Sequence, residues 1–353
     1  MKGKIIIIIL LVVILCLSFF FILKNKRNIK DTEGVVVLPT MNDKLSGDST
    51  WCGTLQLVWN DMVDELLEGN IPKEENEVIA NLNKMDFTTM MISEEYYYKK
   101  FGLKTISLKK EIEKGIKDKF NQTSDILDSF SWDDDNPSKN NDRYFIYTML
   151  YREFEYNKKF SVLANDKFGN YDNIKYFGIN KKSTDEVRNQ IEVLFYNTKD
   201  DFAIKLHTKS NDEVILYKSP KGSTFNEIYD NMVLESNNYE GNRNFNKKDE
   251  FKAPFINFNV KKEYNELSNI VFTSKSGNEY MIDTAIQTIS FALDEKGGRI
   301  KSEAASDIKT TAMPNEEEKR YFNVDNTFAL FLKEEGKDRP YFTARIDDIR
   351  KYQ

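Results

Sequence analysis

Few residues in this chain of 353 have the types and spacing of catalytic machinery. The clearest pair is Cys52, just before a predicted helix start, and His207, the one histidine, on a predicted strand. A helix dipole lowers the pKa of a thiol at its N-terminus, and a distant histidine can serve as the base, as in cysteine hydrolases. The competing interpretation is structural. His207 shares the strand face of Ala203 and Lys205, which indicates a solvated histidine, and Cys52 beside Trp51 is typical of a small packed residue.

Two other motifs suggest chemistry less specifically. Residues 131–137 carry Asp133, Asp134 and Asp135, which could hold Ca²⁺, but a surface turn is the commoner explanation of a segment rich in Asp, Asn and Pro. The Lys-Gly-Ser at Lys221 lacks the remainder of a phosphate-binding loop and indicates a turn. A single histidine excludes a His-rich metal site. We therefore expect no metal and no cofactor.

Composition describes a globular protein without a nucleic-acid partner. There are 51 Lys and Arg against 57 Asp and Glu, and no predicted helix face gathers the basic residues, so nucleic-acid binding is disfavoured. Hydrophobic residues make up 40% of the chain, with 25 Phe, so a sizeable core can form. Of the two cysteines, Cys16 lies in the N-terminal apolar run, which leaves Cys52 without a disulfide partner in the folded part.

Helices are expected early in the chain and strands later. One helix pattern follows Thr54, and a second begins at Ser107 with apolar residues at i+4 spacing. Strands are expected, in chain order, at residues 144–151, 194–195, 202–206, 214–217, 256–260, 289–293, 328–332 and 342–346. Helices followed by strands without regular alternation predict an α+β fold.

The N-terminus predicts a membrane anchor. Residues 5–23 form an uncharged apolar run about 28 Å long as a helix, and no small-residue cleavage site follows. We expect a signal-anchor over 1–23, a flexible tether over 24–48 and one folded domain over 49–353. Flanking Lys and Arg would keep the domain inside, but the short N-terminal tail favours an extracytoplasmic domain, as in a bacterial surface protein.

The stretch after the strand at 289–293 has the pattern of a strand in the place of a loop. Every second residue from 302 to 312 would lie on the same side of an extended strand, and these residues are mostly small. They are Ser302, Ala304, Ser306, Ile308, Thr310 and Ala312, of which Ile308 alone is bulky. The other side is mostly polar: Glu303, Ala305, Asp307, Lys309, Thr311 and Met313. By itself this alternation is also compatible with an exposed polar linker.

Flanking motifs make the C-terminal half resemble the serpin family. The segments that carry the resemblance are 253–267, 286–297, the Glu303-Ala304-Ala305 run, 322–332 and 339–346, with a weaker match at 150–160. The 322–332 segment departs from the family signature at Asn326 and Ala329. Tyr156 stands where serpins place tryptophan. No counterpart of the family's Ser-Pro-x-Ser segment is found, and nothing before residue 140 is matched.

The resemblance implies an exposed reactive loop and a large mixed or antiparallel sheet with smaller sheets. A protease would cleave the loop near Met313, Pro314 or Asn315, and the freed segment would insert into the sheet. Gly297 and Gly298 would form the hinge, although Arg299, Ile300 and Lys301 intervene before Glu303. The resemblance thus implies a monomeric, non-enzymatic inhibitor of an extracellular protease. The alternative is a surface-binding protein that uses the same scaffold without inhibition.

Overall fold

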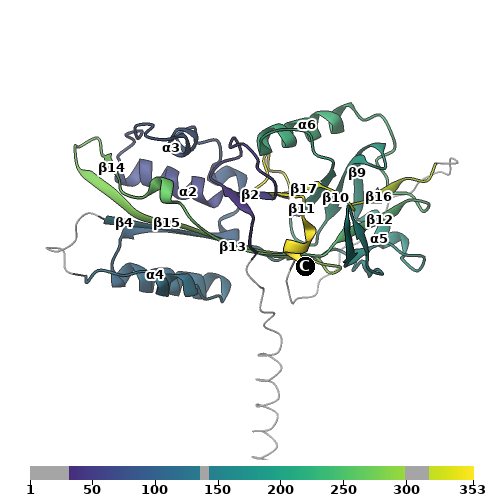
Figure 1. The fold of residues 1–353 in the computed structure, drawn as a ribbon, viewed down its shortest axis with the longest axis horizontal. Coiled ribbons are helices and arrows are strands. Elements are labelled where there is room, and N and C mark those ends of the chain that lie inside the picture. Colours follow the sequence, from purple (N-terminus) through teal and green to yellow (C-terminus); the bar gives the residue numbers. More distant parts are fainter. Residues whose placement is uncertain (1–31, 136–142, 299–317) are drawn as a thin grey trace, which may run out of the picture. The chain divides into compact units, whose positions relative to one another are not determined.

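The computed structural model describes residues 32–135, 143–298 and 318–353, which form an α+β domain (Figure 1). The helices near the N-terminal end and the strands after residue 143 follow the order expected from the sequence, so the predicted fold class is confirmed. The predicted reactive-loop residues, Ser302 to Asn315, lie outside the described ranges.

The central sheet has the strand order β13-β15-β4-β3, with β14 paired to β15. Its members are β3 (Tyr97–Leu103), β4 (Arg143–Tyr151), β13 (Ile256–Glu263), β14 (Ile270–Thr273) and the long β15 (Glu279–Leu293). The strand predicted at residues 289–293 is therefore the C-terminal end of the much longer β15.

A second sheet of seven strands holds both ends of the described chain, in the order β1-β2-β18-β17-β11-β10-β9. Its strands are β1 (Val36–Leu38), β2 (Ser49–Cys52), β9 (Ile191–Thr198), β10 (Asp201–His207), β11 (Asp212–Lys218), β17 (Phe328–Glu334) and β18 (Phe342–Ile346). β11 and β17 are buried along almost their whole length, as expected of strands covered on both faces.

A third sheet has the order β16-β12-β8-β5, and a separate hairpin pairs β6 with β7. These strands are β5 (Ser161–Val162), β6 (Asp166–Phe168), β7 (Tyr171–Ile174), β8 (Tyr176–Gly178), β12 (Glu250–Pro254) and β16 (Tyr321–Asn323). The short β16 pairs with β12 alone, so it is an edge strand held by three register pairs.

Three of the α-helices cover the two faces of the central sheet, and two others contact β9 of the second sheet. The α-helices are α2 (Thr54–Asp61), continued by the π-helix η1 (Met62–Leu66), then α3 (Glu77–Leu82), α4 (Ile106–Phe120), α5 (Asp185–Asn189) and α6 (Phe225–Asn238). Single 3₁₀ turns lie at Thr89–Met91, Glu94–Tyr96, Asp125–Ser129, Asn265–Leu267 and Ile349–Tyr352. In Figure 1, α2 and α3 lie on one face of the sheet and α4 on the other.

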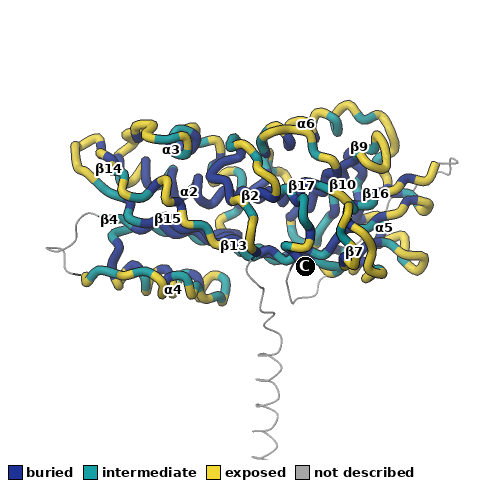
Figure 2. The backbone as a smooth tube through the Cα atoms, viewed as in Figure 1, coloured by how far each residue is buried: buried dark blue, intermediate teal, exposed yellow. Residues whose placement is uncertain are grey.

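α4 shows how the local sequence builds an element. Thr105 caps the helix by accepting a hydrogen bond from the Leu108 backbone N–H at 3.3 Å, and Asn121 ends it in the left-handed conformation. Ile112 and Ile116 are fully buried on the sheet side, whereas most of the opposite side is exposed (Figure 2). The helix predicted from Ser107 is thus confirmed to within one residue at its start.

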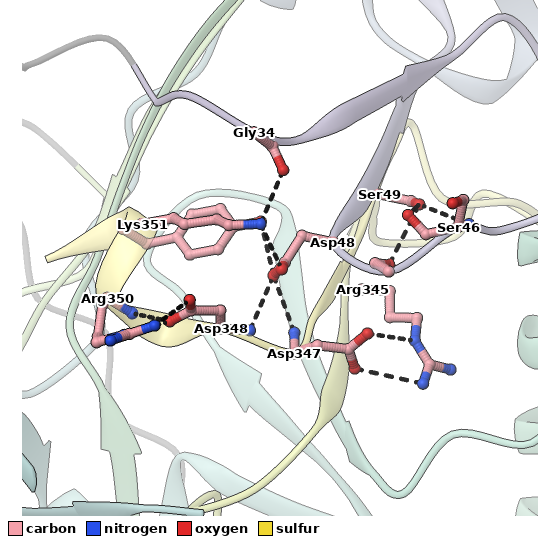
Figure 3. A network of polar contacts seen from close by, with 11 residues as sticks. Gly34, Ser46, Asp48, Ser49, Arg345, Asp347, Asp348, Arg350 and Lys351 are labelled. Carbon is pink, nitrogen blue, oxygen red and sulfur yellow. Dashed lines mark hydrogen bonds and ion pairs between the residues drawn. The ribbon is translucent and has the colours of Figure 1, made fainter. Parts of the chain in front are cut away.

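Residues 32–48, part of the predicted tether, pack against the domain. β1 pairs in parallel with β2, and the buried carboxylate of Asp48 joins this segment to the C-terminal end (Figure 3). Its oxygens accept hydrogen bonds from the backbone N–H of Asp347 and Asp348, at 2.9 and 3.1 Å, and from the Lys351 ammonium at 2.8 Å. A buried carboxylate with several donors fixes its surroundings. The buried side chains of Val37, Leu38 and Met41 also pack in the main core, so both polar and apolar contacts order this segment.

The prediction of a single-pass membrane protein is corrected. Across residues 32–135, 143–298 and 318–353, no helix is long and apolar enough to cross a membrane. The apolar run at 5–23, on which the prediction rested, falls outside these ranges. We therefore withdraw the membrane localisation.

Candidate reactive-loop site

The central pair of strands in the large sheet runs parallel, whereas its outer neighbours run antiparallel. β15 is parallel to β4, while β13 is antiparallel to β15 and β3 is antiparallel to β4. A strand placed between β4 and β15 would therefore be antiparallel to both if it ran back from the end of β15. Such an insertion moves the two strands from about 4.8 Å apart to about twice that spacing.

A buried polar network lies across this junction on the α2 side. Thr148 of β4 and Gln287 of β15 are register partners. Gln287 donates from its amide nitrogen to the Thr54 hydroxyl at 2.8 Å and to the Cys52 carbonyl at 3.1 Å. The Thr54 hydroxyl donates to that of Thr148 at 3.2 Å, and the Tyr264 hydroxyl donates to the Gln287 carbonyl oxygen at 2.7 Å.

Each network residue is at most 1% exposed, so these bonds replace water for groups that cannot reach it. Thr54 is the first residue of α2, which means that one helix terminus holds both strands of the junction. Separating the strands would break the contacts of Thr54 with at least one of them. We call Thr54, Thr148, Tyr264 and Gln287 the junction network.

The opposite face of the junction is covered by α4. Leu108, Ile112 and Ile116 of the helix pack in one apolar cluster with Phe145, Tyr147, Met149 and Ile286 of the two strands. The Tyr147 hydroxyl also lies 3.2 Å from that of Thr288 on β15 and 2.8 Å from that of Ser124, just beyond the helix. α4 would therefore have to shift if the strands parted.

The predicted hinge glycines lie at the end of this junction and are held tightly. After β15, residues 294–297 form a turn, and the backbone N–H of Tyr156 donates to the Lys296 carbonyl at 2.9 Å. Gly297 has φ +126°, and a Cβ on it would lie 2.5 Å from the Phe154 carbonyl oxygen. A Cβ on Gly298 would lie 2.9 Å from the Phe154 ring. Glycine is needed at both positions because the backbone lies very close to the segment that follows β4 and leaves no room for a side chain. Conformational flexibility of the hinge is not the reason.

Tyr156, at the position of the family tryptophan, forms part of this packing. It is 2% exposed and contacts the Phe160 ring edge-on, with centroids 4.8 Å apart. Burial raises the pKa of its hydroxyl well above the usual value, and this hydroxyl has no hydrogen-bond partner in the described residues. Its role here is to fill the core beneath the hinge.

The chain re-enters the described structure at a buried ion pair. Arg320 donates to the Asp249 carboxylate from its side chain, at 2.7 and 3.3 Å, and from its backbone N–H at 3.1 Å. Its guanidinium also donates to the carbonyls of Asn242 and Asn244, each at 2.6 Å. With the Asp249 side chain fully buried, this pair fixes the start of β16 against β12.

The hydrolase pair does not come together. Cys52 of β2 is the register partner of Phe342 on β18. Successive register partners across the sheet are then Leu332 on β17, Val214 on β11 and Leu206 on β10, and Leu206 is next to His207 in the sequence. Four strand spacings of about 4.8 Å put the two residues about 19 Å apart. Burial also raises the pKa of the Cys52 thiol to about 11, opposite to what a nucleophile needs. The cysteine hydrolase hypothesis is rejected.

The acidic loop at 131–137 has a local structural role at its end. The Asp135 carboxylate accepts hydrogen bonds from the backbone N–H and hydroxyl of Ser107, at 3.0 and 2.8 Å, in the first turn of α4. In the described ranges, no three His, Cys, Asp or Glu side chains are grouped to hold a metal ion.

Sequence reasoning missed the junction network. The available signal was polarity in the wrong place, because Thr148 interrupts the apolar run at 144–151 and Gln287 precedes the run at 289–293. An uncharged polar residue inside a buried strand demands a hydrogen-bond partner. Nothing local identifies Thr54 and Tyr264 as those partners, since they lie 94 residues before Thr148 and 23 before Gln287.

Comparison with known proteins was made by sequence and by structure. No protein-family model matches the chain, and no curated protein matches it. Serpin-12 of Manduca sexta aligns with a TM-score of 0.52 at 12% identity, over 88% of this chain and 96% of that one. The thermophilic serpin Tengpin in its native state aligns with a TM-score of 0.47 at 11% identity, over 87% and 90%. Serpin48 of the insect Tenebrio molitor aligns with a TM-score of 0.42 at 12% identity. The alignment covers 68% of this chain and 64% of the length of Serpin48.

The strand arrangement defines an α+β protein in which the described residues on both sides of 299–317 are held against the domain. This chain has the serpin fold. The resemblance in the sequence is thereby confirmed for the architecture, and it extends before residue 140, where no motif was matched.

Proposed function

We propose that the protein is a suicide-substrate protease inhibitor that acts through cleavage and insertion of residues 302–315. The observation that carries the proposal is the parallel pairing of β4 and β15, at whose common end the loop begins. Residues 302–312 would span about 37 Å when extended, enough to run back along the nine residues of β4.

The chemistry belongs to the attacking protease. Its nucleophile would form an ester or thioester with the carbonyl of the scissile residue, near Met313, Pro314 or Asn315. The following residue would leave as a free amine. Insertion of the freed segment would place the small side chains of Ser302, Ala304, Ser306, Thr310 and Ala312 toward the core and carry the acyl-enzyme along. The proposed partner is therefore a protease with a serine or cysteine nucleophile.

The experiment is to incubate the full chain with a panel of such proteases and to follow two readouts. One is a covalent complex that survives SDS, and the other is the melting temperature of the loop-cleaved protein. Both are expected to appear for at least one protease. Cleavage that yields neither a complex nor added thermal stability would contradict strand insertion.

A specific observation favours a second function, a binding protein on the same scaffold without inhibition. The Gly297 and Gly298 backbone is wedged against Phe154, so the start of the loop is held rather than free to swing. Slow insertion would let the protease complete hydrolysis before it is trapped. Thermal stabilisation on cleavage without a covalent complex would identify this case.

A further inference from the structure

Strand β3 forms an open edge of the central sheet. It ends the strand order β13-β15-β4-β3, and in the described part of the chain it pairs with β4 alone. Its register with β4 is continuous, from Tyr97 opposite Leu150 to Leu103 opposite Tyr144. An uninterrupted edge of this kind is a template on which another strand can form backbone hydrogen bonds. Because β4 separates this edge from β15, the proposed inhibitory mechanism leaves it unused.

The backbone groups of alternate residues in β3 point away from β4. The Lys104 backbone N–H, just after the strand, donates to the Arg143 carbonyl at 2.9 Å. Since the direction of hydrogen bonding alternates along an antiparallel strand, Lys99 and Phe101 direct both N–H and C=O to the open side. Among residues 32–135, 143–298 and 318–353, none forms a hydrogen bond with these four groups. An added strand would satisfy them.

Two lysines lie in the middle of this edge, and lysine commonly protects edge strands from pairing. Here both ammonium groups are held by helices on the faces of the sheet. The Lys99 ammonium lies 2.5 Å from the Asp61 carboxylate at the end of α2, and its side chain is 19% exposed. The Lys100 ammonium lies 3.0 Å from the Glu111 carboxylate of α4. The two charges are therefore matched within the chain and do not by themselves block the edge.

Symmetry and charge restrict how two copies of β3 can pair. A twofold axis makes the strands antiparallel, and because the outward-pointing residues must face each other, the pairing is centred on one residue. Only centres at Lys99, Lys100 or Phe101 overlap most of the strand. A centre at Lys99 or Lys100 sets a lysine directly opposite its own copy, which is destabilising. A centre at Phe101 sets the two Phe101 residues opposite each other. It also sets Lys100 opposite Gly102 and Lys99 opposite Leu103, so no like charges face.

We propose that β3 pairs with β3 of a second copy of this chain, centred on Phe101, and joins the central sheets of the two copies. The Phe101 side chain is half-buried at the border of the main core, so a second ring beside it would cover more of its surface. The sequence resemblance implies a monomer, and this dimer goes beyond it. It does not depend on the proposed function, because the loop would insert on the other side of β4.

The first test is the mass of the full chain in solution, measured by sedimentation at micromolar concentration. We expect a dimer, and Lys99→Pro should raise its dissociation constant at least about ten-fold. Proline removes an outward N–H while the ladder between β3 and β4 stays intact. The matched control is Lys99→Ala, which also loses the Asp61 contact but keeps the N–H and should remain dimeric. A monomeric wild type, or equal dissociation constants in the two variants, would overturn the proposal.

Cysteine cross-linking tests the register without proline, in a Cys16→Ser background where the remaining Cys52 is fully buried. Phe101→Cys should form an intermolecular disulfide on mild oxidation, because facing Cα atoms about 5.5 Å apart suit a disulfide. Lys100→Cys should not, since it lies diagonally from its own copy at about 7–8 Å, and Lys99→Cys lies farther still. A disulfide that forms more readily at either lysine position would overturn the register. The absence of a disulfide in all three variants would overturn the pairing of β3.

Discussion

Thr148 of β4 and Gln287 of β15 are partners across a parallel strand pair, and both form hydrogen bonds with the Thr54 hydroxyl. The bonds are buried, so their groups would be unsatisfied if the strands separated without a replacement. A strand inserted between β4 and β15 must therefore break this arrangement before it adds its own backbone hydrogen bonds. On the proposed mechanism, the junction network would therefore stabilise the uncleaved form specifically.

Replacing Gln287 by methionine should lower the stability of the uncleaved protein by about 1–3 kcal/mol, because the Tyr264 hydroxyl and the Cys52 carbonyl lose a buried partner. Denaturant unfolding of the intact chain measures this loss. The matched control is Gln56→Met, another buried glutamine, whose amide bonds to Asn60 and the Leu82 carbonyl away from the junction.

If the loop inserts as proposed, Gln287→Met should destabilise the uncleaved protein more than the cleaved one. The difference in melting temperature between the cleaved and the uncleaved protein should then be larger for Gln287→Met than for Gln56→Met. If this difference in melting temperature is the same in both variants, the junction network does not oppose loop insertion.

Gly297→Ala should destabilise the fold by about 3 kcal/mol or more, because backbone strain and overpacking each cost about 1–3 kcal/mol. The added methyl would meet the Phe154 carbonyl and the Glu155 Cα, which are main-chain atoms and cannot rotate away. Gly336→Ala is the control, with positive φ but nothing within 4 Å, and should cost only about 1–2 kcal/mol. Similar losses measured for both variants by thermal unfolding would show that Gly297 is not wedged.

The α+β class, the α4 helix and most of the late strands could be predicted because their signals are local. Ile112 and Ile116 repeat at helical spacing, and residues 342–346 match β18. The site could not be predicted in this way. Whether Gln287 lies beside Thr148 depends on the register of two strands that are far apart in sequence, and no periodicity encodes that register. The same limit made Cys52 and His207 look like a pair, although four strand spacings separate them.

Arg320→Met should destabilise the domain by about 3–5 kcal/mol, because it leaves the Asp249 carboxylate buried without its cation. The double variant Arg320→Met with Asp249→Leu should recover part of this loss, since no buried charge then remains unpaired. A double-mutant cycle of unfolding free energies measures the coupling. Additive losses would mean that the pair does not hold the start of β16.

Acid should weaken the second sheet through Glu192. The hydrogen bond from His207, followed by that from Lys205, lowers the pKa of this carboxyl from 4.5 to about 2 in the folded protein. Because the folded pKa lies below the unfolded one, the stabilisation is complete above about pH 4.5 and is lost as the pH falls toward 2. Its size is under about 1 kcal/mol, since the side chain is 34% exposed and screened by water.

Unfolding free energies measured between pH 2 and 6 test this assignment. Glu192→Gln should flatten the acid limb, whereas Glu279→Gln, an exposed carboxyl at the start of β15, should leave it unchanged. An acid limb that is identical in wild type and Glu192→Gln would contradict the role of the His207 contact.

Loop insertion itself can be tested by a pair of neighbouring substitutions. The alternation at 302–312 assigns Thr310 to the inward side and Thr311 to the outward side of the inserted strand. Thr310→Arg would force a large cation between the strands and α2 or α4, where desolvation makes it costly. Thr311→Arg carries the same charge one residue away, on the side that tolerates water.

After cleavage by the same protease, the Thr310→Arg protein should lose the gain in melting temperature while Thr311→Arg retains it. The uncleaved proteins should melt alike, because both substitutions lie in the intact loop. Retention of the gain in both variants would mean that cleavage stabilises the protein without burying this face of the loop. Loss in the Thr311→Arg protein alone would reverse the assigned register.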